Sequence, residues 1–120
     1  MQFSDQLVKL DRAVALERLG GDEQLLQEVA RLFLDEYPSL MDEIQAAKES
    51  RNAKLLERAA HSLKGSVANF GADRAVEAAL RLEKMGRGGN LSGVEDAYYE
   101  LEAVMNGIHP ELEELAGELA

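Results

Sequence analysis

The chain has 120 residues and a formal net charge of −10, with 23 acidic and 13 basic residues. This length fits one domain, residues 1–120, that needs no disulfide or metal to fold, and the lack of cysteine excludes a thiolate metal site and a cysteine nucleophile. The acidic balance argues against a nucleic-acid partner; because neither a signal peptide nor an apolar run of about 20 residues is evident, we expect a cytoplasmic protein without membrane segments.

Helical periodicity of apolar residues runs almost from end to end, and glycines and capping residues divide it into five segments. The first is short, about residues 11–19, and ends at Gly20 and Gly21. The second begins after Asp22 as cap and keeps its apolar phase across Pro38, which predicts one long helix kinked at the proline, with two helices as the alternative. Its stripe is Leu26, Val29, Phe33, Tyr37, Leu40, Ile44 and Ala47.

Three further helices follow. The third is predicted to begin after Asn52 as cap and to stop at Gly71, which we expect to be a C-cap. The fourth is predicted to run from a cap at Asp73 to about residue 85, followed by a loop, "GRGGN", at 86–90.

The fifth helix is predicted to open with a capping box of Ser92 and Glu95. We expect Pro110 to bend or break it. Amphipathic helices with short connections are typical of an all-α fold, here an up-down-up-down four-helix bundle with a short extra N-terminal helix.

A histidine lies on the outer face of the third helix. At 100° per residue, His61 falls about 160° from Leu63, the centre of the apolar stripe, and so points to solvent. Arg58 and Gly65 fall on the same outer side. A helical glycine costs about 1 kcal/mol relative to alanine, which raises the question of what Gly65 is for.

Small and basic residues surround this histidine. Gly65, at i+4 from His61, leaves the imidazole uncrowded, and Ala68 continues the cleared strip. Lys64, at i+3, adds a positive charge. An exposed nucleophilic imidazole beside an ammonium suits acceptance of a phosphoryl group from a partner protein. A solvated histidine on a polar face is the competing interpretation of the same geometry.

The stretch "AAHSLKGSVANFGA", residues 59–72, resembles the signature of the histidine-containing phosphotransfer (HPt) domain of two-component phosphorelays. The segments "GGDEQLLQEVARLFLDEYPSLMDEI" and "RLEKMGR" look like helices of the same family. The resemblance implies that His61 accepts a phosphoryl group on Nε2 from a receiver-domain aspartate, or from a kinase, and passes it to another receiver. It also implies that Lys64 stabilises the phosphoryl oxygens and that Gly65 leaves room for the receiver.

The resemblance has further implications for partners and cofactors. Arg58, Ala68 and Arg87 are candidate contacts with the partner, a response-regulator receiver domain or a sensor or hybrid histidine kinase. The chain would be a monomer without an ATP site, a metal or a cofactor of its own, because the receiver supplies Mg²⁺. Glu83 stands where some members have a glutamine near the histidine, and we assign it no role because an acid would repel phosphate.

Two other functions compete with a phosphorelay intermediate. A helical adaptor could bind a receiver or kinase without carrying phosphate, although it would need no exposed nucleophile. A bundle enzyme with a buried metal is disfavoured, because no inward Glu-x-x-His pair lies in the core stripes. The other histidine, His109, is interpreted as structural or solvated.

Overall fold

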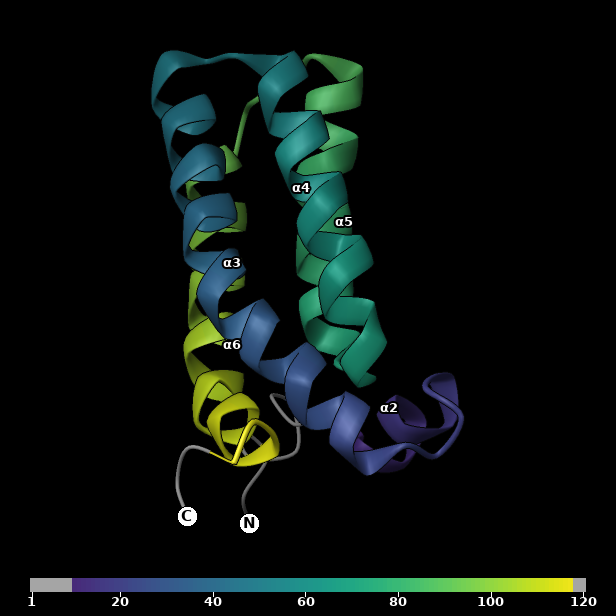
Figure 1. Cartoon of the computed structure of the whole chain (residues 1–120). Coiled ribbons are helices and arrows are strands. Elements are labelled where there is room, and N and C mark those ends of the chain that lie inside the picture. The colour runs from purple at the N-terminus through teal and green to yellow at the C-terminus, as the bar shows by residue number, and fades with distance from the viewer. Residues whose placement is uncertain (1–9, 118–120) are drawn as a thin grey trace, which may run out of the picture.

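The computed structural model describes residues 10–117, which form α-helices, one 3₁₀ turn and no strand (Figure 1). The short N-terminal helix is followed by four long ones, the all-α composition predicted from the periodicity. The elements are α2 (Arg12–Arg18), α3 (Glu23–Ser50), α4 (Ala53–Val67), η1 (Ala68–Phe70), α5 (Asp73–Gly88) and α6 (Val94–Leu115).

Side-chain caps open the first three helices; the sequence predicts those at Asp22 and Asn52, whereas Asp11, predicted as the first residue of its helix, is the N-cap instead. Asp11, Asp22 and Asn52 each accept a hydrogen bond from the backbone N–H three residues on, at 3.0–3.1 Å. Such a bond satisfies one of the amide groups that a helix start leaves unpaired. Two of these caps therefore determine where α3 and α4 begin.

Both internal prolines lie within continuous helices. α3 is one helix through Pro38, which excludes the two-helix alternative, and its axis changes direction partway along (Figure 1). α6 also continues through Pro110, so the break considered at this residue does not occur. Proline removes one backbone hydrogen bond, but Ile108 and Leu112 on either side are fully buried and hold both parts of α6 against the core.

Three predicted boundaries in the second half of the chain are wrong. Asp73 is the first residue of α5 rather than its cap, where its charge complements the helix dipole. α5 continues to Gly88, so three of the five residues of the predicted loop are helical. Gly93 stands at the N-cap of α6 with no side-chain cap, and Glu95 instead pairs with Lys48 of α3 at 2.9 Å, so the capping box does not form.

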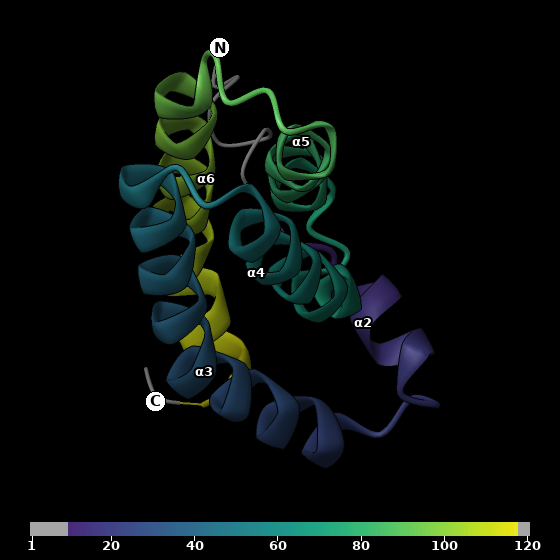
Figure 2. The same ribbon diagram turned by 90° about the horizontal axis from the view of Figure 1, so that it is seen from above.

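The four long helices share one core. α3 contacts α4 and α6, and α5 contacts the same two helices; seen from above, α3 and α6 lie beside each other opposite α4 and α5 (Figure 2). The largest fully buried side chains come from all four helices and from η1: Leu26, Ile44, Leu56, Leu63, Val67, Phe70, Leu82, Val94, Leu101, Met105, Ile108 and Leu112.

The short helix α2 closes the end of the molecule where α4 passes into α5. The backbone N–H of Asp11 donates to the carbonyl of Phe70 at 2.9 Å. Gly71 ends η1 with φ +64°, and a Cβ there would lie 2.7 Å from the Cβ of Asp11. Gly71 is thus the C-cap that the sequence predicts, and it also lets α2 approach closely.

Candidate functional site

His61 lies on the solvent side of α4, as its angular position predicts. Its side chain is 65% exposed, whereas Leu63 is fully buried. The backbone of α4 is regular here, so the ring is carried by a helix anchored in the core. The site is therefore an imidazole on a rigid, outward-facing surface.

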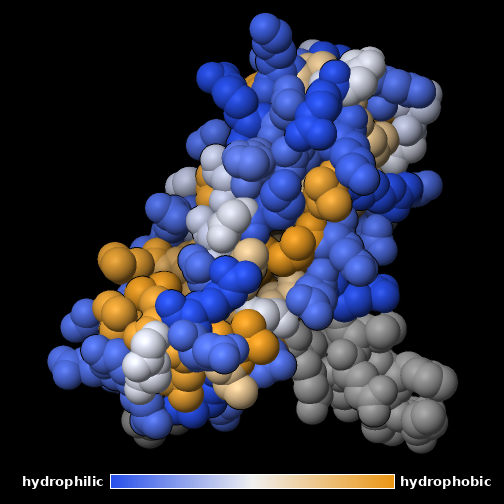
Figure 3. Space-filling view, turned by 90° about the vertical axis from the view of Figure 1, so that its right-hand side faces the viewer, coloured by the Kyte–Doolittle hydropathy of each residue, from blue (hydrophilic) through white to orange (hydrophobic). Residues whose placement is uncertain are grey.

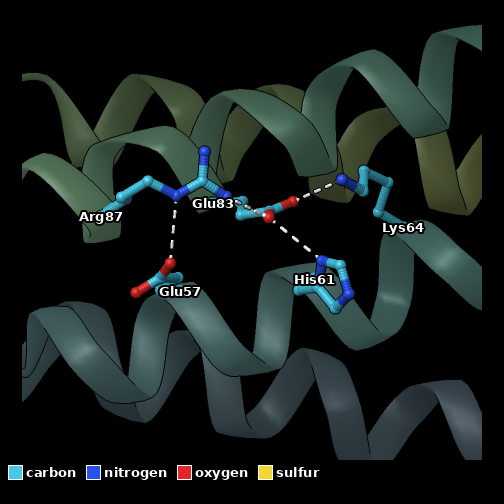
Figure 4. A network of polar contacts seen from close by, with 5 residues as sticks. All are labelled: Glu57, His61, Lys64, Glu83 and Arg87. Carbon is cyan, nitrogen blue, oxygen red and sulfur yellow. Dashed lines mark hydrogen bonds and ion pairs between the residues drawn. The ribbon is translucent and has the colours of Figure 1, made fainter.

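A carboxylate of α5 holds one side of this ring. Nδ1 of His61 lies 3.0 Å from Oε2 of Glu83, and the other ring nitrogen points away from Glu83 (Figure 4). An ionised carboxylate can only accept hydrogen bonds, so Nδ1 must carry the proton. Nε2 then keeps its lone pair, which makes it the nucleophilic atom of the ring.

Glu83 is buried among cations. Its side chain is 3% exposed, Oε1 pairs with Nζ of Lys64 at 2.7 Å, and Oε2 pairs with Nη2 of Arg87 at 2.6 Å. Burial raises the pKa of Glu83, but the contacts of Lys64 and His61 lower this pKa more, so that it falls below its ordinary value. Glu83 is therefore a carboxylate at neutral pH, in agreement with the proton placed on Nδ1.

A second acid joins the network from α4. Nε of Arg87 lies 3.1 Å from Oε2 of Glu57 on α4. The guanidinium therefore links this carboxylate to that of Glu83, which lies on the same helix as Arg87 (Figure 4). Gly86, next to Arg87, makes this bridge possible. A Cβ at Gly86 would lie 2.6 Å from the carbonyl oxygen of Ala53 and from the backbone nitrogen of Glu57, so the two helices meet backbone to backbone.

The surface beside the ring is open. No atom lies within 4 Å of where a Cβ of Gly65 would be, which confirms that this glycine does not serve helix packing. A shallow hollow runs from His61 and Gly65 to α3, where Leu40 and the acids Glu36 and Glu43 line it. These α3 residues share the hollow with His61, and the sequence alone did not identify them.

Apolar side chains gather at one end of this side of the molecule. Hydrophilic residues cover much of the face seen in Figure 3, and apolar ones collect towards the end where α2 and the start of α3 lie. Leu25 and Leu32, both in the first part of α3, are exposed large hydrophobic residues, with Leu32 at 67%. Leu32, Glu36 and Ser66 line a small hollow of about 200 Å³, and Glu36 and Ser66 also line the hollow beside His61.

Three of the predicted site residues belong to the network around Glu83, and Arg58 and Ala68 lie outside it. His61, Lys64 and Arg87 meet around Glu83. Arg58 is exposed on α4 and lines, with His61, a second hollow, whereas Ala68 lies half-buried in η1, beyond the end of α4.

Sequence reasoning missed two acids and a glycine. Glu83 has no role in the sequence-based prediction because an acid would repel phosphate, but it lies behind the ring on the Nδ1 side, where a carboxylate orients the ring. The available signal was the resemblance described above, which implies a polar residue near the histidine at this position. Glu57 and Gly86 left no such signal, because their roles depend on how closely α4 and α5 approach each other.

The second histidine has a structural environment. The hydroxyl of Tyr37 and Nδ1 of His109 are hydrogen-bonded, and Nε2 of His109 lies 3.4 Å from Oε2 of Glu113. Burial, followed by the charge of Glu113, raises the pKa of Tyr37. His109 thus ties α6 to α3, in agreement with the structural interpretation.

Glu83 should make the fold sensitive to acid. Its pKa in the unfolded chain is ordinary, 4.5, and is lower in the folded protein. The ionised carboxylate therefore makes its full contribution to the free energy of unfolding above the unfolded-state pKa of 4.5. This contribution is lost as the pH falls through the lower pKa of the folded state. In urea unfolding from neutral pH down to about pH 3, we expect the wild type to lose stability more steeply than Glu83→Gln. The exposed Glu100→Gln variant should follow the wild type, and parallel curves for wild type and Glu83→Gln would contradict the prediction.

A family model described as "Hpt domain" matches residues 28–118. The chain therefore belongs to the Hpt domain family, whose members take part in the histidine phosphotransfer of two-component signalling. Neither the comparison with curated proteins nor that with solved structures gave a match. Within residues 10–117, no helix is long and apolar enough to cross a membrane, and no cluster of three or more potential metal-ligating side chains occurs.

Proposed function

We propose that this protein is a phosphorelay intermediate that carries a phosphoryl group on Nε2 of His61. The observation that carries the proposal is the exposed ring whose Nδ1 is bound by the buried carboxylate of Glu83. This contact fixes the tautomer and aims the unprotonated Nε2 away from the protein. The proposal takes the four long helices as an up-down-up-down bundle and places the protein in the cytoplasm as a monomer.

The transfer requires no proton to leave the ring. The Nε2 lone pair attacks the phosphorus of an aspartyl phosphate on the receiver, the phosphorus–oxygen bond to the aspartate breaks, and the aspartate leaves as a carboxylate. The neutral imidazole becomes a cationic phosphoimidazole that keeps its Nδ1 proton. Glu83 then faces a full positive charge at 3.0 Å, so its attraction to the ring grows as the bond forms, which is the condition for catalysis by electrostatic stabilisation.

The remaining residues serve access and charge. Lys64 would turn from Glu83 towards the phosphoryl oxygens. Gly65 leaves the surface flat for the receiver, and Arg58 and Ala68 would contact it. Because this chain would hold neither ATP nor a metal, the receiver would supply Mg²⁺, and a sensor or hybrid histidine kinase is the alternative phosphoryl donor.

The test is direct. Receiver domains phosphorylated with a small-molecule donor and Mg²⁺ are mixed with this protein, and its mass and the position of the adduct are determined. One acid-labile phosphoryl group on His61, with His109 unmodified in the same molecule, is the expected result. Receivers that bind but never transfer, across a broad panel, would replace the proposal with the adaptor function.

Gly65 allows access to be separated from stability. Gly65→Leu should keep or raise stability, by up to about 1 kcal/mol, because leucine favours helix and the site is open. We expect transfer from a receiver to slow by about 10- to 100-fold, because the side chain keeps the reacting atoms apart. Stopped-flow transfer and urea unfolding measure the two effects. Gly88→Leu, at an equally open position far along α5, is the control, and unchanged transfer in Gly65→Leu would refute the access role.

A further inference from the structure

The buried carboxylate of Glu83 forms ion pairs with two cationic side chains. Lys64 contacts Oε1 of Glu83 at 2.7 Å, and Arg87 contacts Oε2 at 2.6 Å. The proposed function, on which this inference rests, needs Lys64 elsewhere, at the phosphoryl oxygens. A buried carboxylate that loses its partner is strongly destabilised, so the departure of Lys64 is costly unless another cation stays.

Arg87 is held by a second carboxylate as well as by Glu83. Its Nε is held by Glu57 at 3.1 Å, while its Nη2 contacts Glu83. Arg87 and Glu83 are one turn apart on α5, and Glu57 is fixed opposite them by the close backbone contact at Gly86. Lys64 has only the contact with Glu83 among its ion pairs within the described chain. The guanidinium is thus anchored twice and the ammonium once.

We propose that Arg87 is a positioning residue that remains on Glu83 while Lys64 moves from Glu83 to the phosphoryl group. Glu83 faces two full cations in both end states: Lys64 and Arg87 before transfer, and Arg87 and the cationic ring of His61 after it. Between these states the ring charge is incomplete and Lys64 is already leaving. Arg87 is the partner that holds Glu83 charged, and therefore His61 oriented, throughout this exchange.

A double-mutant cycle with Glu83 tests whether Arg87 acts through this carboxylate. Arg87→Gln should slow phosphoryl transfer from a receiver by about tenfold, equivalent to about 1.4 kcal/mol. In a Glu83→Gln background, the same change should have less than about a twofold further effect, because no carboxylate remains to be held. Arg87→Lys should recover part of the rate, since it keeps the charge.

Control variants and binding measurements separate this role from a direct contact with the receiver. Arg81→Gln removes an equally exposed arginine of α5, one that pairs with Glu100 at 3.1 Å, and should leave the rate unchanged. The affinity for the unphosphorylated receiver should also be unchanged in Arg87→Gln. A lower affinity, or an equal loss of rate in both backgrounds, would overturn the proposal and assign Arg87 to the partner interface.

The movement of Lys64 can be observed without any receiver. Phosphoramidate donates its phosphoryl group to histidine and releases ammonia, so His61 can be modified chemically in the full chain. On modification, the ¹⁵Nζ resonance of Lys64 should shift, while the guanidinium resonances of Arg87 and the ionised carboxyl signal of Glu83 persist. A Lys64 signal that does not change would overturn the proposal. Because this readout needs no partner, it also distinguishes failure of this inference from failure of the relay function.

Discussion

Replacing His61 with glutamine is expected to abolish phosphoryl uptake and to leave the fold intact. Glutamine has no nucleophilic nitrogen, but its amide can still donate to Glu83, so the buried carboxylate keeps a polar neighbour. The side chain at this position is 65% exposed and contributes little to the core. Mass spectrometry after incubation with a phosphorylated receiver should show no adduct above background, and urea unfolding should differ by less than about 1 kcal/mol.

The other histidine provides the matched control. His109→Gln removes a contact with Tyr37 and should lower stability by about 1 kcal/mol, yet phosphoryl uptake should equal that of the wild type. Phosphoryl uptake by His61→Gln, or loss of uptake in His109→Gln, would show that His61 is not the acceptor and would contradict the proposal. Retained receiver binding by His61→Gln would show that recognition and chemistry are separable.

Replacing Gly86 with alanine is expected to destabilise the protein, although alanine favours helix. The added Cβ would lie 2.6 Å from two backbone atoms of α4 and 2.9 Å from the Cα of Glu57, so α4 and α5 must move apart. Overpacking of this kind costs about 1–3 kcal/mol, and the rigid backbone on both sides favours the upper end. Urea unfolding measures the loss, and transfer should also slow because Glu57 and Arg87 separate.

Gly88 is the control for this substitution because it lies in the same helix, and a Cβ added there would have no atom within 4 Å. Gly88→Ala should be neutral or stabilising by up to about 1 kcal/mol. Equal stability of the two alanine variants would mean that the close approach of α4 and α5 carries no energetic weight. The comparison uses the same chemical change at two positions of α5, of which only Gly86 faces the backbone of α4.

Local patterns predicted much of the fold and the outer half of the site. Asp22 and Asn52 signal helix starts through their own side chains, and the outward direction of His61 follows from helical spacing alone. The capping box predicted at the start of α6 does not form: Gly93 stands at the N-cap, and Glu95 pairs with Lys48 on a helix distant in sequence. The end of α5 was predicted too early, because glycine at position 86 has a low helix propensity and so indicates a loop. In the fold, this glycine lies within α5 and allows the close contact with α4.

The inner half of the site required tertiary structure. Whether an acid repels a phosphoryl group or orients the ring depends on which side of the imidazole it occupies, and spacing along α5 does not reveal this for Glu83. Arg87 is likewise predicted from the sequence only as a candidate contact with the partner, not as a partner of Glu83. Only the packing of α5 on α4 places Oε2 of Glu57 3.1 Å from Nε of Arg87.

The open setting of His61 has a consequence for the lifetime and direction of the signal. No segment of the described chain covers the ring, and the hollows on either side of it are shallow. Under the proposed relay, the fold would neither lock the phosphoryl group in nor distinguish an arriving receiver from a departing one. The stored group would persist only as long as the nitrogen–phosphorus bond resists water, and net flow would follow the relative abundance and phosphorylation of the receivers.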